Sequence, residues 1–334
     1  MRPFLHASLV NGRWGDPVLW IETLFERRAI LFDLGDIATL APRKIHRLEH
    51  VFVSHTHVDH FIGFDQMLRV LVGREKTVEV YGPGGIIAQV EHKLSAYCWN
   101  LVESYACDLV FRVSELQSLR ECRIAQFRLK TGFRREDVGE RIVEDGVICR
   151  EPSFRVAAAV LEHGDIACLA FAIEEGAHVN VWKNKLKAQE LPVGPWLKDL
   201  KRAVIEGKPD DHPIRMAGKG NEEEGVMPLG ALKELVTVTA GQKIAYVTDA
   251  AETDSNRQAL VKLIGGADLL FIEAAFAEKD LELARERGHL TTRAAGDIAR
   301  EAGVRRVEAF HFSPRYEGEE ARMLDEVNRA FLGR

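Results

Sequence analysis

The sequence predicts an α/β protein in which two β-sheets pack face to face and helices cover their outer faces. Short runs rich in β-branched and aromatic residues, which are typical of strands, alternate with segments whose apolar residues recur at helical spacing. Strand-like runs separated by turns occur in both halves of the chain, as two packed sheets require. With 334 residues and 46% hydrophobic content, the chain can bury the large cores of such layers.

The first half is expected to begin with paired strands. Residues 18–24 and 29–35 are strand-like and are separated by the charged turn FERR, and a third strand, 51–54, leads directly into a cluster of histidines. Apolar residues at helical spacing predict a helix over 60–73. A strand that stops at Gly-Pro (VEVYGP) and a further helical segment (GIIAQVEHKLSAYCWN) complete this half.

The second half also alternates strand-like runs with helical segments. Buried strands are expected at 243–250, 268–276 and 306–313, and a helix that ends at a glycine is expected at 291–303. The polar, acidic segment 219–228 is predicted to be a solvated loop.

Charge is distributed unevenly along the chain. The net charge of −6 excludes a uniformly basic surface of the kind that holds a protein to nucleic acid by charge alone. Residues 182–208, however, contain seven Lys or Arg against three Asp or Glu, a local charge of +4, so the rest of the chain sums to −10. This basic segment, within an insert at 180–208 that contains Pro and Gly, is where a polyanion is expected to dock.

The cysteines and the apolar runs indicate a cytoplasmic protein. The five cysteines form no CxxC pair, which indicates reduced thiols and leaves His and Asp as the expected metal ligands. The first residues lack a secretory signal pattern, and no run approaches 18 uncharged apolar residues, so we expect no membrane association.

The stretch FVSHTHVDHFIGFD (52–65) is the strongest functional signal. Residues two apart on an extended loop point the same way, so His55 and His57 can bind one ion while Asp59 and His60 bind a second beside it. Imidazole and carboxylate ligands without thiolate suit Zn²⁺, with Mn²⁺ or Fe²⁺ as alternatives. The alternative interpretation is a solvated polar turn that happens to be rich in histidine.

A two-metal site needs more ligands than one loop supplies. His163, Asp249 and His311 each lie at the end of a predicted strand. Taken singly, each is an ordinary polar residue at a strand end. Taken together, they supply one histidine for each metal and a carboxylate to bridge the two.

These motifs resemble a known family. The HTHVDH stretch matches the HxHxDH signature of the metallo-β-lactamase superfamily, and LFDLGD resembles the strand that precedes it there. More narrowly, YVTDA, ADLLFIEAAF, GHLTTRAAGDIAREAG, HFSPRY and the basic Pro-Gly insert together resemble the ribonuclease Z family of tRNA 3′-processing endonucleases. The similarity extends from about residue 28 to residue 316.

The resemblance implies that residues 1–334 form one hydrolase domain with an αββα four-layer sandwich and two Zn²⁺ ions. The implied ligands of one ion are His55, His57 and His163, those of the other are Asp59, His60 and His311, and Asp249 bridges both. A hydroxide that forms between the ions would attack the phosphodiester, because metal coordination lowers the pKa of bound water toward ~7. Asp59 would also orient or deprotonate this nucleophile.

Three further residues have implied roles near the scissile phosphate. His289 is expected to protonate the leaving 3′ oxygen or to donate a hydrogen bond to a phosphate oxygen, with Glu273 orienting it. The alternative for His289 is a structural role at the start of a helix. Arg315 is a candidate phosphate clamp, because a guanidinium can bind two oxygens at once; its alternative is a structural ion pair.

The basic insert resembles the protruding arm with which the family grips tRNA. Lys198, Lys201 and Arg202 would neutralise backbone phosphates, while Trp182 and Trp196 are expected to pack the arm. The implied partners are precursor tRNA or another RNA, and a second copy of the chain in a homodimer. The alternative interpretation of the insert is a solvated amphipathic hairpin.

The chain departs from the family pattern at its first residues, at GDIATL and at VTDA, which affects the substrate more than the hydrolysis. Two other functions therefore stay open. One is a phosphodiesterase or other metallo-hydrolase that acts on a small substrate. The other is a catalytically idle member of the fold that binds RNA.

Overall fold

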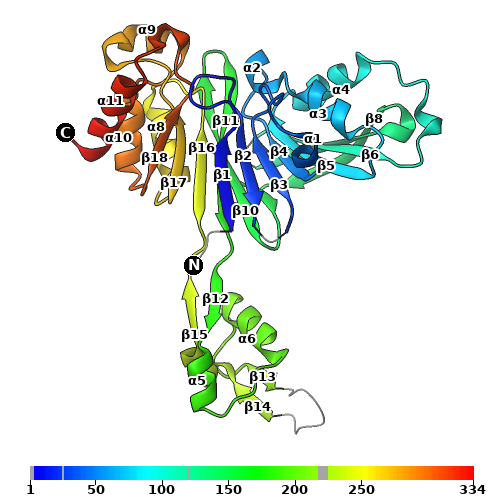
Figure 1. Ribbon diagram of the computed structural model, residues 1–334, viewed down its shortest axis with the longest axis vertical. Helices are drawn as coiled ribbons and strands as arrows, with labels where there is room; N and C mark the ends of the chain where they lie inside the picture. The colour runs from blue at the N-terminus through cyan, green and yellow to red at the C-terminus, as the bar shows by residue number, and fades with distance from the viewer. Residues whose placement is uncertain (1–3, 25, 119, 217–224) are drawn as a thin grey trace. The chain divides into compact units, whose positions relative to one another are not determined.

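The computed structural model describes residues 4–24, 26–118, 120–216 and 225–334. The chain divides into two compact units, a larger one of Met1–Glu174 and Gln242–Arg334 and a smaller one of Glu175–Gly241 (Figure 1). Among the described residues, no helix has the length and apolar character needed to cross a lipid bilayer.

The first sheet of the larger unit has eight strands that pair in chain order. The strands are β1 (Leu5–Leu9), β2 (Leu19–Thr23), β3 (Ala29–Phe32), β4 (Leu48–Phe52), β5 (Lys76–Pro83), β6 (Leu109–Leu116), β7 (Glu121–Arg128) and β8 (Arg135–Ile142). Strands β3 to β6 run parallel, and the pairs on either side are antiparallel. Parallel neighbours need crossover connections, and the helices α1 (Pro42–Ile45), α2 (Val58–Phe61), α3 (Phe64–Leu71) and α4 (Ile86–Ser95) lie in these connections.

The second sheet has six strands in the order β18-β17-β16-β11-β10-β9. They are β9 (Val147–Arg150), β10 (Phe154–His163), β11 (Ile166–Glu175), β16 (Lys243–Val247), β17 (Leu269–Glu273) and β18 (Val307–Phe310). Strands β16, β17 and β18 are parallel. Their connections contain α8 (Asp254–Ile264), α9 (Leu281–Arg287) and α10 (Thr292–Glu301), and α11 (Glu320–Leu332) follows the last strand.

Three hydrophobic cores separate four layers and confirm the predicted αββα sandwich (Figure 1). Side chains alternate across β3, so Leu31 packs with the helices of the first sheet while Phe32 faces the second sheet. In the core between the sheets, the Phe32 ring lies 5.1 Å from that of Phe52 and 5.8 Å from that of Tyr246. On the far side, Ile272 of the second sheet packs with helical residues such as Ile298.

The helix expected over 60–73 is divided into α2 and α3 around Gly63. At Gly63 an added Cβ would lie 2.2 Å from the carbonyl oxygen of Gly35, and the Gly63 amide donates to the carbonyl of Leu34 at 2.9 Å. The close approach of this second backbone segment interrupts the helix, and only glycine leaves room for it.

The smaller unit has its own hydrophobic core. Its elements are β12 (His178–Val181), α5 (Lys183–Ala188), α6 (Trp196–Ile205), β13 (Pro213–Met216), β14 (Gly225–Pro228), α7 (Leu229–Leu232) and β15 (Val236–Thr239), and β12 pairs with β15. Trp196 is buried in this core, as expected, whereas Trp182 is 48% exposed and donates from Nε1 to Thr237.

Two predicted segments belong to this unit. The insert 180–208 lies entirely within it and covers α5 and α6. Of the predicted loop 219–228, residues 219–224 lie outside the described residues, and Gly225–Pro228 is not a loop but strand β14, because it pairs with β13.

Candidate metal centre

The HTHVDH segment follows β4, and its backbone packs against that of the LFDLGD segment at the end of β3. The amide of Leu34 donates to the carbonyl of His60 at 2.9 Å. A Cβ at Gly35 would lie only 2.4 Å from the carbonyl oxygen of Asp59, so the two backbones touch. Since β3 and β4 are parallel neighbours, both segments leave the sheet at the same edge, and one can support the other.

The remaining histidine and carboxylate candidates come from the second sheet. His163 is the last residue of β10, Asp249 lies two residues after β16, and His311 directly follows β18. Asp249 and His311 both have left-handed backbone, with φ of +46° and +59°. Such conformations are costly for residues other than glycine and persist where surrounding structure imposes them, often at functional sites.

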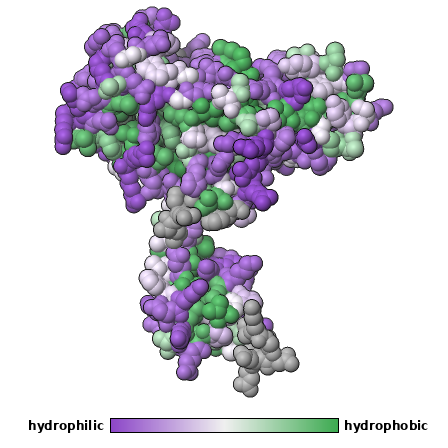
Figure 2. All heavy atoms as spheres, viewed as in Figure 1, coloured by the Kyte–Doolittle hydropathy of each residue, from purple (hydrophilic) through white to green (hydrophobic). Residues whose placement is uncertain are grey.

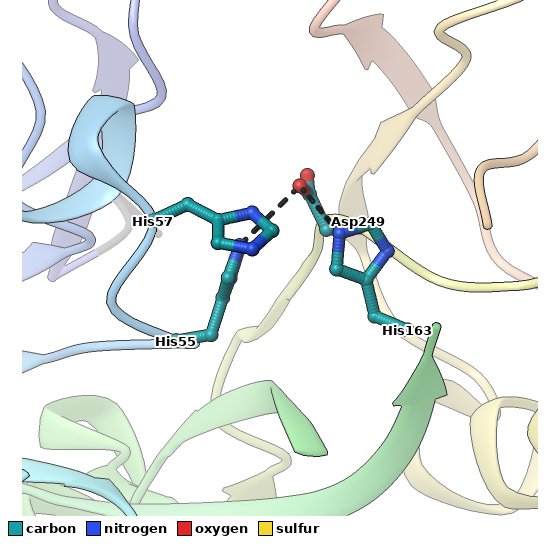
Figure 3. Close-up of side chains that lie close together, drawn as sticks. All are labelled: His55, His57, His163 and Asp249. Atoms are coloured by element: carbon teal, nitrogen blue, oxygen red, sulfur yellow. Dashed lines mark ion pairs between the residues drawn. The ribbon is translucent and has the colours of Figure 1, made fainter. Parts of the chain in front are cut away.

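These segments bring seven side chains together, which we call the metal centre. It consists of His55, His57, Asp59, His60, His163, Asp249 and His311. Ligand atoms of His55, His57, His163 and Asp249 all lie within 4.8 Å of one another, as do those of Asp59, His60 and His311. Figure 3 shows the first group converging, with the rings of His55 and His163 directed at the carboxylate of Asp249.

Asp249 joins the two groups. Its Oδ2 atom lies 3.5 Å from the Nε2 atoms of His55, His60 and His163 alike. On the other side, Oδ2 of Asp59 lies 3.4 Å from Nε2 of His60 and 3.5 Å from Nε2 of His311. Two ligands about 2.1 Å from one tetrahedral ion are themselves separated by roughly 3.4 Å, so the observed separations fit shared cations.

Unsatisfied nitrogen atoms support this fit. Among the described residues, the buried Nε2 atoms of His55 and His60 and Nδ1 of His311 have no hydrogen-bond partner. A buried polar atom without a partner costs free energy, and a cation would satisfy these atoms. The donor set, imidazole and carboxylate oxygen, is one that Zn²⁺, Mn²⁺ and Fe²⁺ accept.

The other ring nitrogen of two of these histidines is held by the protein. Nδ1 of His60 lies 2.9 Å from Oδ2 of Asp33, and Nδ1 of His163 lies 2.8 Å from the carbonyl oxygen of Gly288. Asp33 is fully buried and also accepts hydrogen bonds from Ser54 and from the Tyr246 hydroxyl. These contacts leave Nε2 free to face the centre, which is the usual arrangement around metal-binding histidines.

Asp33 had no role in the sequence prediction. The signal that could have found it is the one that singled out Asp249, an aspartate at the end of a buried strand. The LFDLGD segment resembles the strand that precedes the histidine motif in the metallo-β-lactamase superfamily, but nothing local in the sequence connects Asp33 to His60.

The electrostatics of the centre keep the imidazole of His55 neutral and the carboxylates of Asp59 and Asp249 ionised. Burial and the nearby charge of His60 lower the pKa of His55 to about 3, so this imidazole is neutral at pH 7. Burial opposes ionisation of Asp59, but the adjacent imidazoles of His311 and His60 outweigh it and hold the pKa of Asp59 below its ordinary value. His311 and His60 act in the same way on Asp249, whose pKa is well below its ordinary value.

His289 and Glu273 form a pair beside the centre. Nδ1 of His289 lies 2.9 Å from Oε2 of the fully buried Glu273, whose Oε1 accepts the amide of Ala250 at 2.6 Å. Burial lowers the pKa of His289, but the Glu273 carboxylate outweighs it and raises that pKa above its ordinary value. The helix α10 is capped by Thr291, which accepts from the Ala294 amide, so His289 is not its cap.

The metal centre opens into a cavity of about 620 Å³. Arg315 lines this cavity, and its guanidinium lies 5.8 Å from the ring of Phe276. Among the described residues it has no ion pair. The other three basic candidates, Lys198, Lys201 and Arg202, are exposed on α6 of the smaller unit, where Arg202 pairs with Asp199 at 2.8 Å.

The fold and the position of this centre at the strand ends define a metallo-β-lactamase-fold protein. A model of the β-lactamase superfamily domain matches residues 231–312. Two solved structures share the fold: the metallo-β-lactamase fold protein YhfI from Bacillus subtilis (TM-score 0.54, 15% identity, 96% of this chain and 91% of that chain) and human tRNase Z, short form (TM-score 0.51, 17% identity, 94% and 92%).

Curated relatives define the branch. Ribonuclease Z of Limosilactobacillus fermentum is 30% identical over 317 residues, which cover 92% of this chain and 84% of that protein. Ribonuclease Z of Deinococcus radiodurans is 29% identical over 317 residues, which cover 93% and 91%. The chain belongs to the ribonuclease Z family.

Proposed function

We propose that this protein is a metal-dependent endoribonuclease that hydrolyses a phosphodiester bond at the 3′ end of precursor tRNA, with two divalent cations, Zn²⁺ in the first place, at the metal centre. One observation carries the proposal: a single oxygen of Asp249 lies 3.5 Å from Nε2 of histidines that belong to two different ligand groups. A carboxylate in that position could serve as a ligand at both sites. The family supports the choice of substrate, since its members are named ribonuclease Z and a protein of the same fold is human tRNase Z.

Different residues of the chain would bind the metal ions, orient the attacking water and bind the phosphate. Bound divalent cations would supply Lewis-acid charge to the phosphate and lower the pKa of a coordinated water. Asp59, which is 38% exposed at the cavity wall, is placed to orient the attacking water, because burial is incomplete there and its carboxylate stays ionised. Arg315 on the same wall can bind the non-bridging oxygens of the phosphate.

His289 is suited to protonate the leaving 3′ oxygen. Its raised pKa keeps a larger fraction of the ring protonated at neutral pH than in a free histidine. Because Nδ1 is engaged by Glu273, Nε2 is the nitrogen available to the substrate, and the ring lies on the wall of the same cavity. The product would then carry a free 3′ hydroxyl.

The smaller unit is proposed to bind the body of the RNA. Lys198, Lys201 and Arg202 are exposed along one helix and can contact successive backbone phosphates. The net charge of −6 makes such a local basic surface necessary for RNA binding. We further propose that the enzyme acts in the cytoplasm as a homodimer, in which the arm of one subunit presents RNA to the other.

The test is incubation of the purified protein with a precursor tRNA that carries a 3′ trailer, followed by mapping of both new ends. We expect cleavage near the mature 3′ end that leaves a 3′ hydroxyl, loss of cleavage with chelator, and recovery when Zn²⁺ or Mn²⁺ is added. Asp249→Asn is the inactive control, because it removes the charge that both ion sites share.

Three results would contradict the proposal. Cleavage that persists after complete chelation would exclude the metal centre, and a 2′,3′-cyclic phosphate product would exclude attack by water. Hydrolysis of bis(p-nitrophenyl) phosphate without any RNA cleavage would favour a phosphodiesterase of small substrates.

A further inference from the structure

We propose that Trp14 is a stacking platform for a nucleobase next to the scissile phosphate, and that it makes the cavity selective for RNA over esters without a base. The inference rests on the proposed function. Trp14 lies in the loop between β1 and β2, which is far in sequence from each segment of the metal centre. It nevertheless lines the same cavity of about 620 Å³ as His57, Asp59 and Asp249.

The indole ring of Trp14 is held in a defined orientation. Its Nε1 donates to Oε2 of Glu320 at 2.8 Å, and its ring meets that of Phe312 edge to face, with centroids 5.2 Å apart and planes at 72°. Phe312 directly follows the proposed ligand His311. These two contacts fix the ring of Trp14 beside the metal centre. Its Nε1 atom, the only polar atom of the side chain, already has Glu320 as its partner.

The loop that carries Trp14 is tied to the same region. The guanidinium of Arg13 donates to Glu308 on β18 at 2.6 Å, and the amide of Phe312 donates to the carbonyl of Arg13 at 3.0 Å. Asn11 closes the loop by donating to the carbonyl of Asp16 at 2.9 Å. These contacts connect the loop to the strand end that presents His311, so the platform and the centre keep their relative positions.

The other walls of the cavity indicate what the ring would receive. Phe276 also lines the cavity, but it is buried and the Arg315 guanidinium lies over its ring. The exposed guanidinium groups of Arg287 and Arg315 lie at the wall. Among the described residues, neither arginine has an ion pair. Aromatic rings together with unpaired cations are the features with which proteins bind single-stranded nucleic acid, where bases stack and phosphates are neutralised. A small ester would use the cations and leave the aromatic surface unused.

Packing alone would predict different behaviour. If Trp14 only covered Phe312, its replacement would lower stability and slow every substrate equally. If the ring receives a base, its replacement would matter only when the base is present.

The test is a cycle of two changes, one in the protein and one in the RNA. The variants are Trp14→Ala, Trp14→Leu and Trp14→Phe. The substrates are a precursor tRNA and the same RNA with a single abasic nucleotide placed either immediately 5′ or immediately 3′ of the cut. We expect Trp14→Ala and Trp14→Leu to lower kcat/KM for intact RNA about tenfold or more, as the loss of one stacked base does elsewhere. Trp14→Phe should retain most of the activity.

One of the two abasic substrates should lower the wild-type kcat/KM by a similar factor, and combining it with Trp14→Leu should lower it no further. Equal losses of Trp14→Leu on intact and both abasic substrates would overturn the inference while leaving the proposed function intact. Absence of RNA cleavage by the wild-type protein would overturn both. Trp14→Leu keeps an apolar side chain against Phe312, so the cycle can be read even if Trp14→Ala does not fold.

Discussion

At the scale of single residues, Asp249 and its neighbours illustrate how a buried carboxylate is kept charged. Asp249 is buried, which by itself opposes ionisation, yet the imidazoles of His311 and His60 lie beside it and hold its pKa well below the ordinary value. Its left-handed backbone turns the side chain off the end of β16 toward the histidines. The cost of that conformation, of order 1–3 kcal/mol, is tolerated because the parallel strands β16 and β17 beside it are buried over all but their first residues.

Asp33 should matter to metal affinity although it does not face the cavity. We expect Asp33→Asn to weaken Zn²⁺ binding by about 10- to 100-fold, because the amide no longer fixes the ring of His60 as an anion does. Competition with a chromogenic chelator measures the change. Tyr246→Phe, which removes only one hydrogen bond to the same carboxylate, is the matched control and should have a smaller effect. Equal affinity in Asp33→Asn and the wild type would contradict the orienting role.

Gly35 should be intolerant of any side chain. In Gly35→Ala the new Cβ would lie 2.4 Å from the Asp59 carbonyl and 2.6 Å from Cβ of Asp16, so the two segments must move apart. We expect a loss of about 1–3 kcal/mol in the free energy of unfolding and a loss of bound metal, measured by urea denaturation and by metal analysis. Gly84→Ala is the control, since the nearest atom to its Cβ is 4.0 Å away. A fully stable Gly35→Ala with normal metal content would show that this contact is unimportant.

At the scale of secondary structure elements, the ends of parallel strands do most of the positioning. Glu273 ends β17 and His311 follows β18, so the two parallel neighbours present their side chains at one edge of the second sheet. The connection between these strands carries His289 back over the same edge, where Glu273 meets it. One βαβ unit thus supplies both members of the pair and a ligand candidate.

The Glu273–His289 pair predicts a shift in the pH profile of RNA cleavage. Because Glu273 raises the pKa of His289, the ring stays protonated to a higher pH, and activity that needs this proton falls only as the pH rises through the raised pKa. Glu273→Gln removes the charge, so the same fall should begin at a lower pH. Rates measured across the neutral to alkaline range give the comparison.

Glu282→Gln serves as the control for this profile, since Glu282 has an 87% exposed side chain whose one ion pair among the described residues is with Arg285. In Glu282→Gln, the pH at which activity falls on the alkaline side should be the same as in the wild type. An alkaline limb that does not move in Glu273→Gln would mean that His289 does not supply the proton.

At the scale of the whole molecule, positive charge is concentrated in one segment and not in one whole unit, since Glu175–Gly241 contains ten Lys or Arg and ten Asp or Glu. Figure 2 shows hydrophilic residues over much of the visible face of both units, with hydrophobic residues in smaller patches between them. The basic segment 182–208 belongs to the smaller unit, while the rest of the chain is acidic. Local rather than overall charge should therefore control RNA binding, and it should do so in a salt-dependent way.

The combined variant K198A/K201A/R202A should weaken RNA binding and reduce its salt dependence. If each side chain contacts one phosphate, the slope of log affinity against log salt concentration should become less steep by about 2 to 3. Binding of labelled precursor tRNA at several salt concentrations measures this slope. The control K262A/K279A/R305A removes the same number of exposed positive charges from the larger unit and should change the slope little. Identical slopes for the two triple variants would contradict a role of α6 in RNA binding.

Much of the fold and of the candidate centre could be predicted because the signals are local. The HTHVDH segment contains four His or Asp side chains next to a buried strand, and such a density of potential ligands is visible without any knowledge of the fold. His163, Asp249 and His311 could be proposed because each follows an apolar run. The αββα layers followed from the order of strand-like and helical runs, and the structure confirmed them.

Other features could not be predicted from the sequence, because they depend on contacts between distant segments. The division of the helix at Gly63 depends on a backbone 28 residues earlier in the chain, and the strands β14 and β15 of the smaller unit are only four residues long each. The role of Asp33 depends on which ring lies opposite it, and that of Trp14 on a loop that reaches the far end of the chain.

The sequence by itself determined the layered fold and the kinds of ligand, because apolar periodicity and residue chemistry are properties of short segments. Only the tertiary structure decided that one oxygen of Asp249 faces histidines of both groups, that Asp33 orients His60, and that Trp14 shares their cavity. The reason is physical: strand order and register bring together side chains that are up to about 300 residues apart, and no local pattern records which strand ends will be neighbours.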